Sequence, residues 1–127
     1  MAAALAEAGI GPNDIDYINA HGTGTTNNDL SEGIAIERLF GKEPPPLSST
    51  KPFTGHTLGA AGGIEAGFCC LSLQQHMIFP NLNWHTPMKE LNLKPQTFLR
   101  QNERLTYVLS NSFGFGGNDT SLIFSRT

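Results

Sequence analysis

Short apolar runs alternate with helix-favouring segments along this chain, and that alternation limits the folds open to it. Strands are predicted at 15–20, 47–50, 104–110 and 120–124, and helices at 1–8, 29–40 and 58–77. Such an order predicts an α/β fold in which helices pack on a mixed sheet. With 127 residues and no long linker, the chain is expected to form one domain over residues 1–127.

Glycine and acidic residues indicate how the predicted helices begin, end and pack. Asp29 and Glu32 have the spacing of a capping box, which places the start of the second helix at Asp29. The third helix carries two rows of small residues at four-residue spacing, Gly59-Gly63-Gly67 and Gly62-Ala66-Cys70. A glycine inside a helix costs about 1 kcal/mol, so the rows predict close approach to another element. We therefore expect a central, buried helix.

Composition and charge exclude several classes of function. The formal net charge of −3 argues against a protein that binds nucleic acid or an anionic membrane. No run of 18 apolar residues is present, and the N-terminal residues lack the basic and apolar regions of a secretion signal. The adjacent Cys69 and Cys70 form no disulfide framework and are expected to be small buried side chains. These features favour a cytoplasmic protein.

Three segments combine glycine with side chains suited to chemistry, and each follows or ends a predicted strand. They are His21-Gly-Thr-Gly-Thr25, Lys51-Pro-Phe-Thr-Gly-His56 and Asn111-Ser-Phe-Gly-Phe-Gly-Gly117. Ligands of open α/β sheets collect at the carboxyl ends of the strands, so the segments are expected to meet there. The glycines match neither a dinucleotide fingerprint nor a phosphate-binding loop, and the four histidines lack metal-ligand spacing.

Together with Ser49-Thr50 and the run to Gly62, the three segments resemble the C-terminal motifs of β-ketoacyl-acyl carrier protein synthases. The resemblance covers nearly the whole chain, in order. It implies the C-terminal half of a thiolase-like fold, with a mixed sheet, packed helices and a central Gly/Ala-rich helix. The family's nucleophilic cysteine belongs to the N-terminal half and has no counterpart here. The isolated chain is therefore expected to be inactive.

The resemblance also assigns roles to particular residues. His21 and His56 correspond to the two histidines that stabilise a developing enolate, and Lys51 to the lysine that supports them. The amide of Phe115 corresponds to an oxyanion-hole donor and its ring to a gate, while Thr23 and Thr25 correspond to hydroxyls that bind phosphopantetheine. The positions that can surround a monovalent cation in the family correspond to Asn19, Glu65, Ser110 and Asn111. The two histidines, with Lys51 behind them and the Phe115 amide, are expected to share one cavity.

The implied reaction belongs to fatty acid biosynthesis: an acyl thioester condenses with malonyl-acyl carrier protein, with loss of CO2, to give 3-oxoacyl-acyl carrier protein. It needs no cofactor beyond the phosphopantetheine of the carrier protein. The implied partners are acyl carrier protein, the N-terminal half of the enzyme and a second copy in a homodimer, with neither nucleic acid nor membrane.

Three alternatives remain open on the sequence. A polyketide ketosynthase shares the His-Gly-Thr-Gly-Thr motif, although Lys51-Pro-Phe-Thr-Gly-His56 and the chain end soon after Phe124 favour the stand-alone enzymes. A non-catalytic subunit that sets chain length is a second alternative, although such a subunit can lose the histidines and lysine that are retained here. The third is a generic glycine-rich domain that binds anions.

Overall fold

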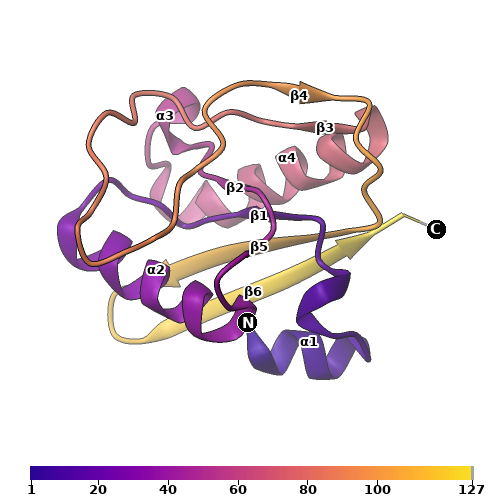
Figure 1. The fold of residues 1–127 in the computed structure, drawn as a ribbon, viewed down its shortest axis with the longest axis horizontal. Helices are drawn as coiled ribbons and strands as arrows, with labels where there is room; N and C mark the ends of the chain where they lie inside the picture. The colour runs from indigo at the N-terminus through magenta and orange to yellow at the C-terminus, as the bar shows by residue number, and fades with distance from the viewer. Residues whose placement is uncertain (127) are drawn as a thin grey trace.

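The computed structural model describes residues 1–126 and shows a four-stranded mixed sheet in the order β2-β1-β5-β6 (Figure 1). Strands β1 (Tyr17–Asn19), β2 (Leu47–Ser48) and β5 (Tyr107–Gly114) are parallel, and β6 (Asn118–Ser125) is antiparallel to β5. A separate antiparallel pair joins β3 (Met77–Ile78) to β4 (Arg100–Gln101). The predicted α/β fold is confirmed, whereas the β3–β4 pair was missed because two-residue strands carry no alternation.

Helices cover both faces of the sheet, and side chains that alternate along β1 and β5 separate two apolar cores. Tyr17 and Val108 pack against α4 (Ala61–Gln75), while Ile18 and Leu109 pack on the side of α1 (Ala2–Ala8) and α2 (Thr26–Phe40) (Figure 1). The short helix α3 (Lys51–Thr54) follows β2, and 3-10 turns span Pro12–Asp14 and Leu58–Ala60. Strand β1 is thus buried between helices on both sides.

The predicted capping box at Asp29 and Glu32 is wrong. Helix α2 begins at Thr26, three residues earlier than expected, and its N-cap Thr25 makes no side-chain capping bond. Asp29 accepts a hydrogen bond from the Gly24 amide instead. Glu32 turns towards the loop that precedes the helix. Both carboxylates therefore fix that loop and not the start of the helix.

The predicted burial of the glycine rows is also wrong for most of their length. Gly63 and Gly67 are exposed, and a Cβ atom at either would meet nothing within 4 Å in the described part of the chain. Only Gly62 approaches another element closely, since a Cβ atom there would lie 3.1 Å from the Ser112 Oγ. The expectation of two buried cysteines holds for Cys69 alone, because Cys70 is exposed. The buried residues of α4 are Ala61, Glu65, Cys69, Ser72 and Leu73.

A tight turn joins β5 and β6 at Phe115, Gly116 and Gly117. Gly116 and Gly117 have φ angles of 87° and 85°, a backbone region that side chains with a Cβ rarely adopt. Strand β5 therefore extends four residues beyond the predicted end and carries Asn111, Ser112 and Phe113 within the sheet. Within residues 1–126, no helix is long and apolar enough to cross a membrane.

We expect Leu109→Ala to lower the free energy of unfolding of this chain by about 2–5 kcal/mol, because the Leu109 side chain is fully buried on the central strand β5. Chemical denaturation followed by circular dichroism measures the change. Leu99→Ala is the matched control, since Leu99 is 45% exposed. Equal losses in the two variants would contradict the position assigned to the core.

Candidate active site

The carboxyl ends of the three parallel strands bring the predicted segments together at one edge of the sheet. His21 follows β1, Lys51 follows β2, and Phe113 lies near the end of β5. The ring centroids of His21 and His56 are 5.6 Å apart with an interplanar angle of 86°, and those of His21 and Phe113 are 5.5 Å apart. The predicted convergence of the two histidines is confirmed.

Lys51 lies behind His21 and is buried, with 7% of its surface exposed. Its Nζ donates to the Glu65 carboxylate, to the His21 carbonyl oxygen at 2.5 Å and to the His21 Nδ1 at 3.2 Å. An ammonium group has three N–H donors, so each of them has an acceptor here. The predicted position of Lys51 behind His21 is confirmed, whereas its pairing with Glu65 was not expected from the sequence.

Both imidazoles present the same nitrogen as a donor. Since the Lys51 ammonium only donates, the His21 Nδ1 accepts and the proton of the neutral ring lies on Nε2. The His56 Nδ1 accepts from the Leu58 amide at 3.1 Å, which places its proton on Nε2 as well. The site therefore offers two Nε2–H donors from rings in edge-to-face contact.

Burial and the positive charge of Lys51 lower the pKa of His21 to about 4, with burial the larger cause and the neighbouring His56 a smaller one. His21 is thus neutral at neutral pH and can donate from Nε2 without carrying a charge. In the unfolded chain the ring has its ordinary pKa of 6.5, so between pH 6.5 and about 4 the unfolded chain binds a proton that the folded chain does not. The contribution of His21 to the free energy of unfolding is therefore fully present above pH 6.5 and is lost as the pH falls towards 4.

Glu32 anchors the His21 loop from the opposite face of the sheet. Its carboxylate accepts from the amides of His21 and Gly22, each at 2.9 Å, and from the Asn111 Nδ2 at 3.0 Å. Burial raises the pKa of Glu32 against the effect of these hydrogen bonds. This role of Glu32 was not expected from the sequence, and the signal available was a glutamate four positions before Ile36, on the same helical face as that apolar residue.

Gly22 gives the loop its shape. Its φ angle is +43°, and a Cβ atom at this position would lie 2.6 Å from the Ser49 Cβ. A larger residue would be strained by the backbone and would also collide with the segment before Lys51. The first glycine of the His-Gly-Thr-Gly-Thr motif is therefore required, because it lets the loop after β1 pass close to Ser49, which follows β2.

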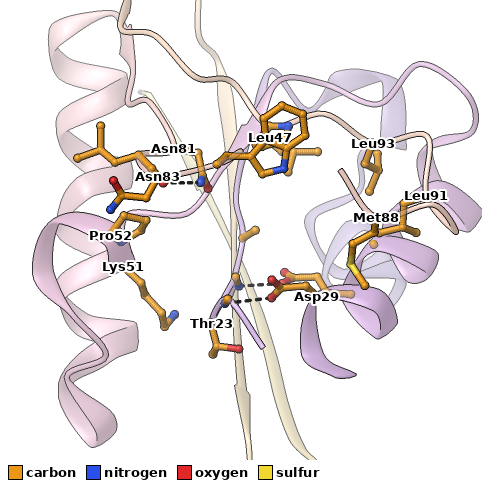
Figure 2. Close-up of a pocket in the computed structure, with 18 of the residues that line it drawn as sticks. Thr23, Asp29, Leu47, Lys51, Pro52, Asn81, Asn83, Met88, Leu91 and Leu93 are labelled. Atoms are coloured by element: carbon orange, nitrogen blue, oxygen red, sulfur yellow. Dashed lines mark hydrogen bonds between the residues drawn. The ribbon is translucent and has the colours of Figure 1, made fainter. Parts of the chain in front are cut away.

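A cleft of about 720 Å³ opens beside these groups, between α2, α3 and the loop at 81–95. Thr23, Lys51 and His56 line one part of it, and apolar side chains of Met88, Leu91 and Leu93 lie across from Lys51 (Figure 2). The hydroxyls of Thr23 and Thr25 are hydrogen-bonded at 2.8 Å, although Thr25 is not among the lining residues. The cleft combines polar groups at the histidines with an apolar wall.

Phe115 does not lie beside the histidines in the way that Phe113 does. It is fully exposed at the turn between β5 and β6, and no ring contact joins it to another residue within 1–126. The presence of its amide in the same cavity as His21 stays a prediction. The aromatic contact with His21 comes from Phe113, to which the sequence assigned no role.

Comparison with known proteins identifies the family. The family model described as β-ketoacyl synthase, C-terminal domain, matches residues 1–85. The chain belongs to the β-ketoacyl synthase family.

The relatives show how much of a family member the chain represents. It is 45% identical over 128 residues to 3-oxoacyl-[acyl-carrier-protein] synthase 2 of Staphylococcus aureus, covering 99% of this chain and 31% of that protein. It is 46% identical over 115 residues to 3-oxoacyl-[acyl-carrier-protein] synthase 1 of Haemophilus influenzae, covering 88% of this chain and 28% of that protein. The chain thus spans about three tenths of the length of these curated relatives.

Solved structures confirm the thiolase-like ketosynthase fold. A β-ketoacyl synthase from Burkholderia phymatum superimposes with a TM-score of 0.89 and 39% identity, over 100% of this chain and 31% of that one. A type II polyketide ketosynthase, solved in complex with its acyl-carrier protein, gives a TM-score of 0.89 and 32% identity over 99% of this chain and 31% of that one. The generic anion-binding alternative is therefore excluded.

The four residues expected from the family resemblance to surround a monovalent cation do not all point to one place. The Glu65 carboxylate is engaged by Lys51 and Ser112, whereas the Asn111 side chain lies on the other face, bonded to Glu32 and Ser121. Adjacent residues of a strand point to opposite faces, so Ser110 and Asn111 do not converge. Among residues 1–126 the buried Asn19 Oδ1 has no hydrogen-bond partner, and the Asn19 Nδ2 contacts the Glu65 carbonyl oxygen at 3.4 Å.

Removing the Lys51–Glu65 pair is expected to raise the pKa of His21. The double variant Lys51→Met/Glu65→Gln removes the positive charge beside the His21 Nδ1 and leaves no unpaired buried carboxylate. Burial of the His21 ring still holds its pKa below 6.5 in this variant. NMR titration of the His21 ring measures the shift. Lys94→Met, at an exposed lysine, is the control. A His21 pKa that stays near 4 in the double variant would refute the electrostatic role of Lys51.

Proposed function

We propose that the protein to which this chain belongs catalyses the condensation of fatty acid biosynthesis, in which an acyl thioester and malonyl-acyl carrier protein give 3-oxoacyl-acyl carrier protein and CO2. The two Nε2–H donors of His21 and His56 carry the proposal. The names and 45–46% identity of the curated relatives support it. Residues 1–127 then form its C-terminal thiolase-like domain, and the enzyme acts in the cytoplasm.

The decarboxylation step accounts for the two imidazoles. The bond between the malonyl carboxylate carbon and the α-carbon breaks, CO2 leaves, and the electron pair passes into an enolate whose charge lies on the thioester oxygen. Two N–H donors aimed at that oxygen stabilise the charge as it develops. Neutral imidazoles do so without transferring a proton, and the lowered pKa of His21 keeps this ring neutral. Lys51 holds the His21 tautomer through its hydrogen bond to Nδ1.

The condensation step requires a nucleophile that carries the acyl group. The enolate carbon attacks the acyl thioester, the new C–C bond forms, and a thiolate leaves. We assign that thiolate to the part of the family members that lies outside this chain. Cys69 is unsuited to the role, because burial raises its pKa to about 12. Cys70 is exposed but lies inside helix α4, far from the N-terminal turn that stabilises thiolates.

The remaining assignments follow from the same reaction. Thr23 lines the cleft beside His56, which supports a role for the Thr23–Thr25 pair in binding the phosphopantetheine arm of acyl carrier protein. The Phe115 amide completes an oxyanion hole with the nucleophile's own amide. The partners are acyl carrier protein, the N-terminal half and a second copy of the enzyme. No step requires a resident cofactor.

Polyketide synthesis is the second candidate, because the structural neighbours include a ketosynthase of a type II polyketide system and one of a bacillaene polyketide synthase. A ketosynthase from Xenorhabdus doucetiae, solved in complex with its chain length factor, is 45% identical over 97% of this chain, with a TM-score of 0.76. The retained histidines and lysine favour a catalytic subunit over a chain-length partner. Incubation of the complete protein with malonyl-acyl carrier protein and a saturated acyl primer separates the pathways: a single extension supports fatty acid synthesis, and repeated extension without reduction supports the polyketide alternative.

In the complete enzyme, His21→Ala or His56→Ala is expected to lower malonyl decarboxylation at least about 100-fold, because each variant removes one donor to the enolate oxygen. Acylation of the nucleophilic cysteine should remain detectable by intact-mass analysis. His76→Ala is the matched control, since His76 contacts Glu103 and Arg126 and lies away from this site. Normal decarboxylation in either site variant would overturn the proposed roles.

The purified chain alone is expected to form no acyl adduct when it is incubated with acyl-acyl carrier protein. The buried Cys69 thiol and the mid-helix Cys70 lack the environment that activates a nucleophile. Intact-mass analysis of the chain provides the measurement, with a Cys69→Ser/Cys70→Ser variant as the blank. A stable adduct on either cysteine, followed by release of a 3-oxoacyl product, would contradict this expectation.

A further inference from the structure

Ser112 lies on the side of β5 that faces α4. It contacts the Glu65 end of the Lys51–Glu65 pair, whereas His21 contacts the Lys51 end. Its Oγ donates to the Glu65 Oε2 at 3.3 Å, while Glu65 Oε1 accepts from Lys51. Within residues 1–126, these two side chains are the hydrogen-bond donors to the Glu65 carboxylate. The carboxylate is therefore bound at both oxygens, Oε1 by Lys51 and Oε2 by Ser112.

Helix α4 comes closest to Ser112 at Gly62, where the lack of a side chain leaves room for the Ser112 hydroxyl. A Cβ atom at Gly62 would lie 3.1 Å from the Ser112 Oγ and 3.7 Å from its Cβ. Within residues 1–126, an added Cβ at Gly59, Gly63 or Gly67 would meet nothing within 4 Å, so Gly62 alone among the glycines of the two rows makes such an approach. The helix thus approaches β5 at the turn that presents Glu65 to Ser112.

We propose that Ser112 is a positioning residue of this active site: by holding Glu65 Oε2, it directs Oε1 to Lys51 and so fixes the proton of His21 on Nε2. This inference rests on the proposed function, because the Nε2–H donor matters to the reaction only if it meets the enolate oxygen.

A carboxylate held at one oxygen turns easily about its terminal bond, whereas a second donor fixes the plane of the group. Lys51 distributes three donors among Glu65, the His21 carbonyl and the His21 Nδ1, so a shift of Glu65 displaces Nζ from all three. Without the donor at Nδ1, nothing in this network keeps the His21 proton on Nε2. Ser112 therefore acts through Glu65 and Lys51 and not on the substrate.

The test uses Ser112→Ala in the complete enzyme, with Ser112→Thr as the variant that keeps the hydroxyl. Nitrogen-15 NMR of the His21 ring reports the tautomer directly and requires no activity. In Ser112→Ala we expect a measurable population with the proton on Nδ1, and a fall of about tenfold in kcat for malonyl decarboxylation with little change in KM. Ser112→Thr should restore both.

Thr120→Ala is the matched control, because Thr120 pairs with Ser112 across the β5–β6 ladder and is exposed. It should leave the tautomer and kcat unchanged. An unchanged His21 tautomer in Ser112→Ala would overturn the inference even if activity fell, since the loss would then come from general disruption. A shifted tautomer with unchanged kcat in Ser112→Ala would overturn the link to catalysis. Failure of the proposed function is distinguishable, because it appears as normal decarboxylation in His21→Ala.

Discussion

The buried ion pair between Lys51 and Glu65 is the interaction on which the arrangement of the site depends. Glu65 is 2% exposed, and burying two charges costs several kcal/mol unless their remaining donors and acceptors are bonded. Here the carboxylate has donors at both oxygens, and the ammonium has three acceptors. Loss of one partner would leave an uncompensated charge, which typically costs about 3–5 kcal/mol. Packing of α4 on the sheet and orientation of His21 are therefore parts of one network.

A second buried carboxylate holds the same loop from the other side of the sheet. Glu32 of α2 binds two consecutive amides at His21 and Gly22, while Lys51, held by Glu65 of α4, binds the His21 carbonyl and ring. The His21 backbone and imidazole are thus fixed before any substrate arrives. Donors that are oriented in advance stabilise charge without reorganisation during a reaction, which is what the proposed enolate-forming step requires. The sandwich of β1 between helices makes this double attachment possible.

Particular residues show where sequence reasoning succeeded and where it did not. The convergence of His21, His56 and Lys51 was predictable, because His21 lies in the segment after β1 and the other two lie in the segment after β2, and parallel strands end at one edge of a sheet. Glu32 was misassigned, since spacing to Asp29 fits a capping box and a linear sequence does not show which way a helical side chain points. The glycine rows suggested burial, but the structure leaves Gly63 and Gly67 exposed and uses only Gly62 for close approach. Phe113, which contacts His21, was passed over in favour of Phe115.

The sequence by itself determined the α/β class, the order of the principal elements, the family and the identity of the two histidines and the lysine. These depend on local patterning and on motifs whose residues are close together along the chain. The tertiary structure decided which partners those residues have: Lys51 meets a glutamate 14 positions later, and His21 meets Glu32 on one face and the Lys51–Glu65 pair on the other. The tautomers, the lowered pKa of His21 and the orientation of the donors follow from those long-range contacts. Burial and charge act through space, and only the packing of α2 and α4 on opposite faces of β1 fixes the distances over which they act.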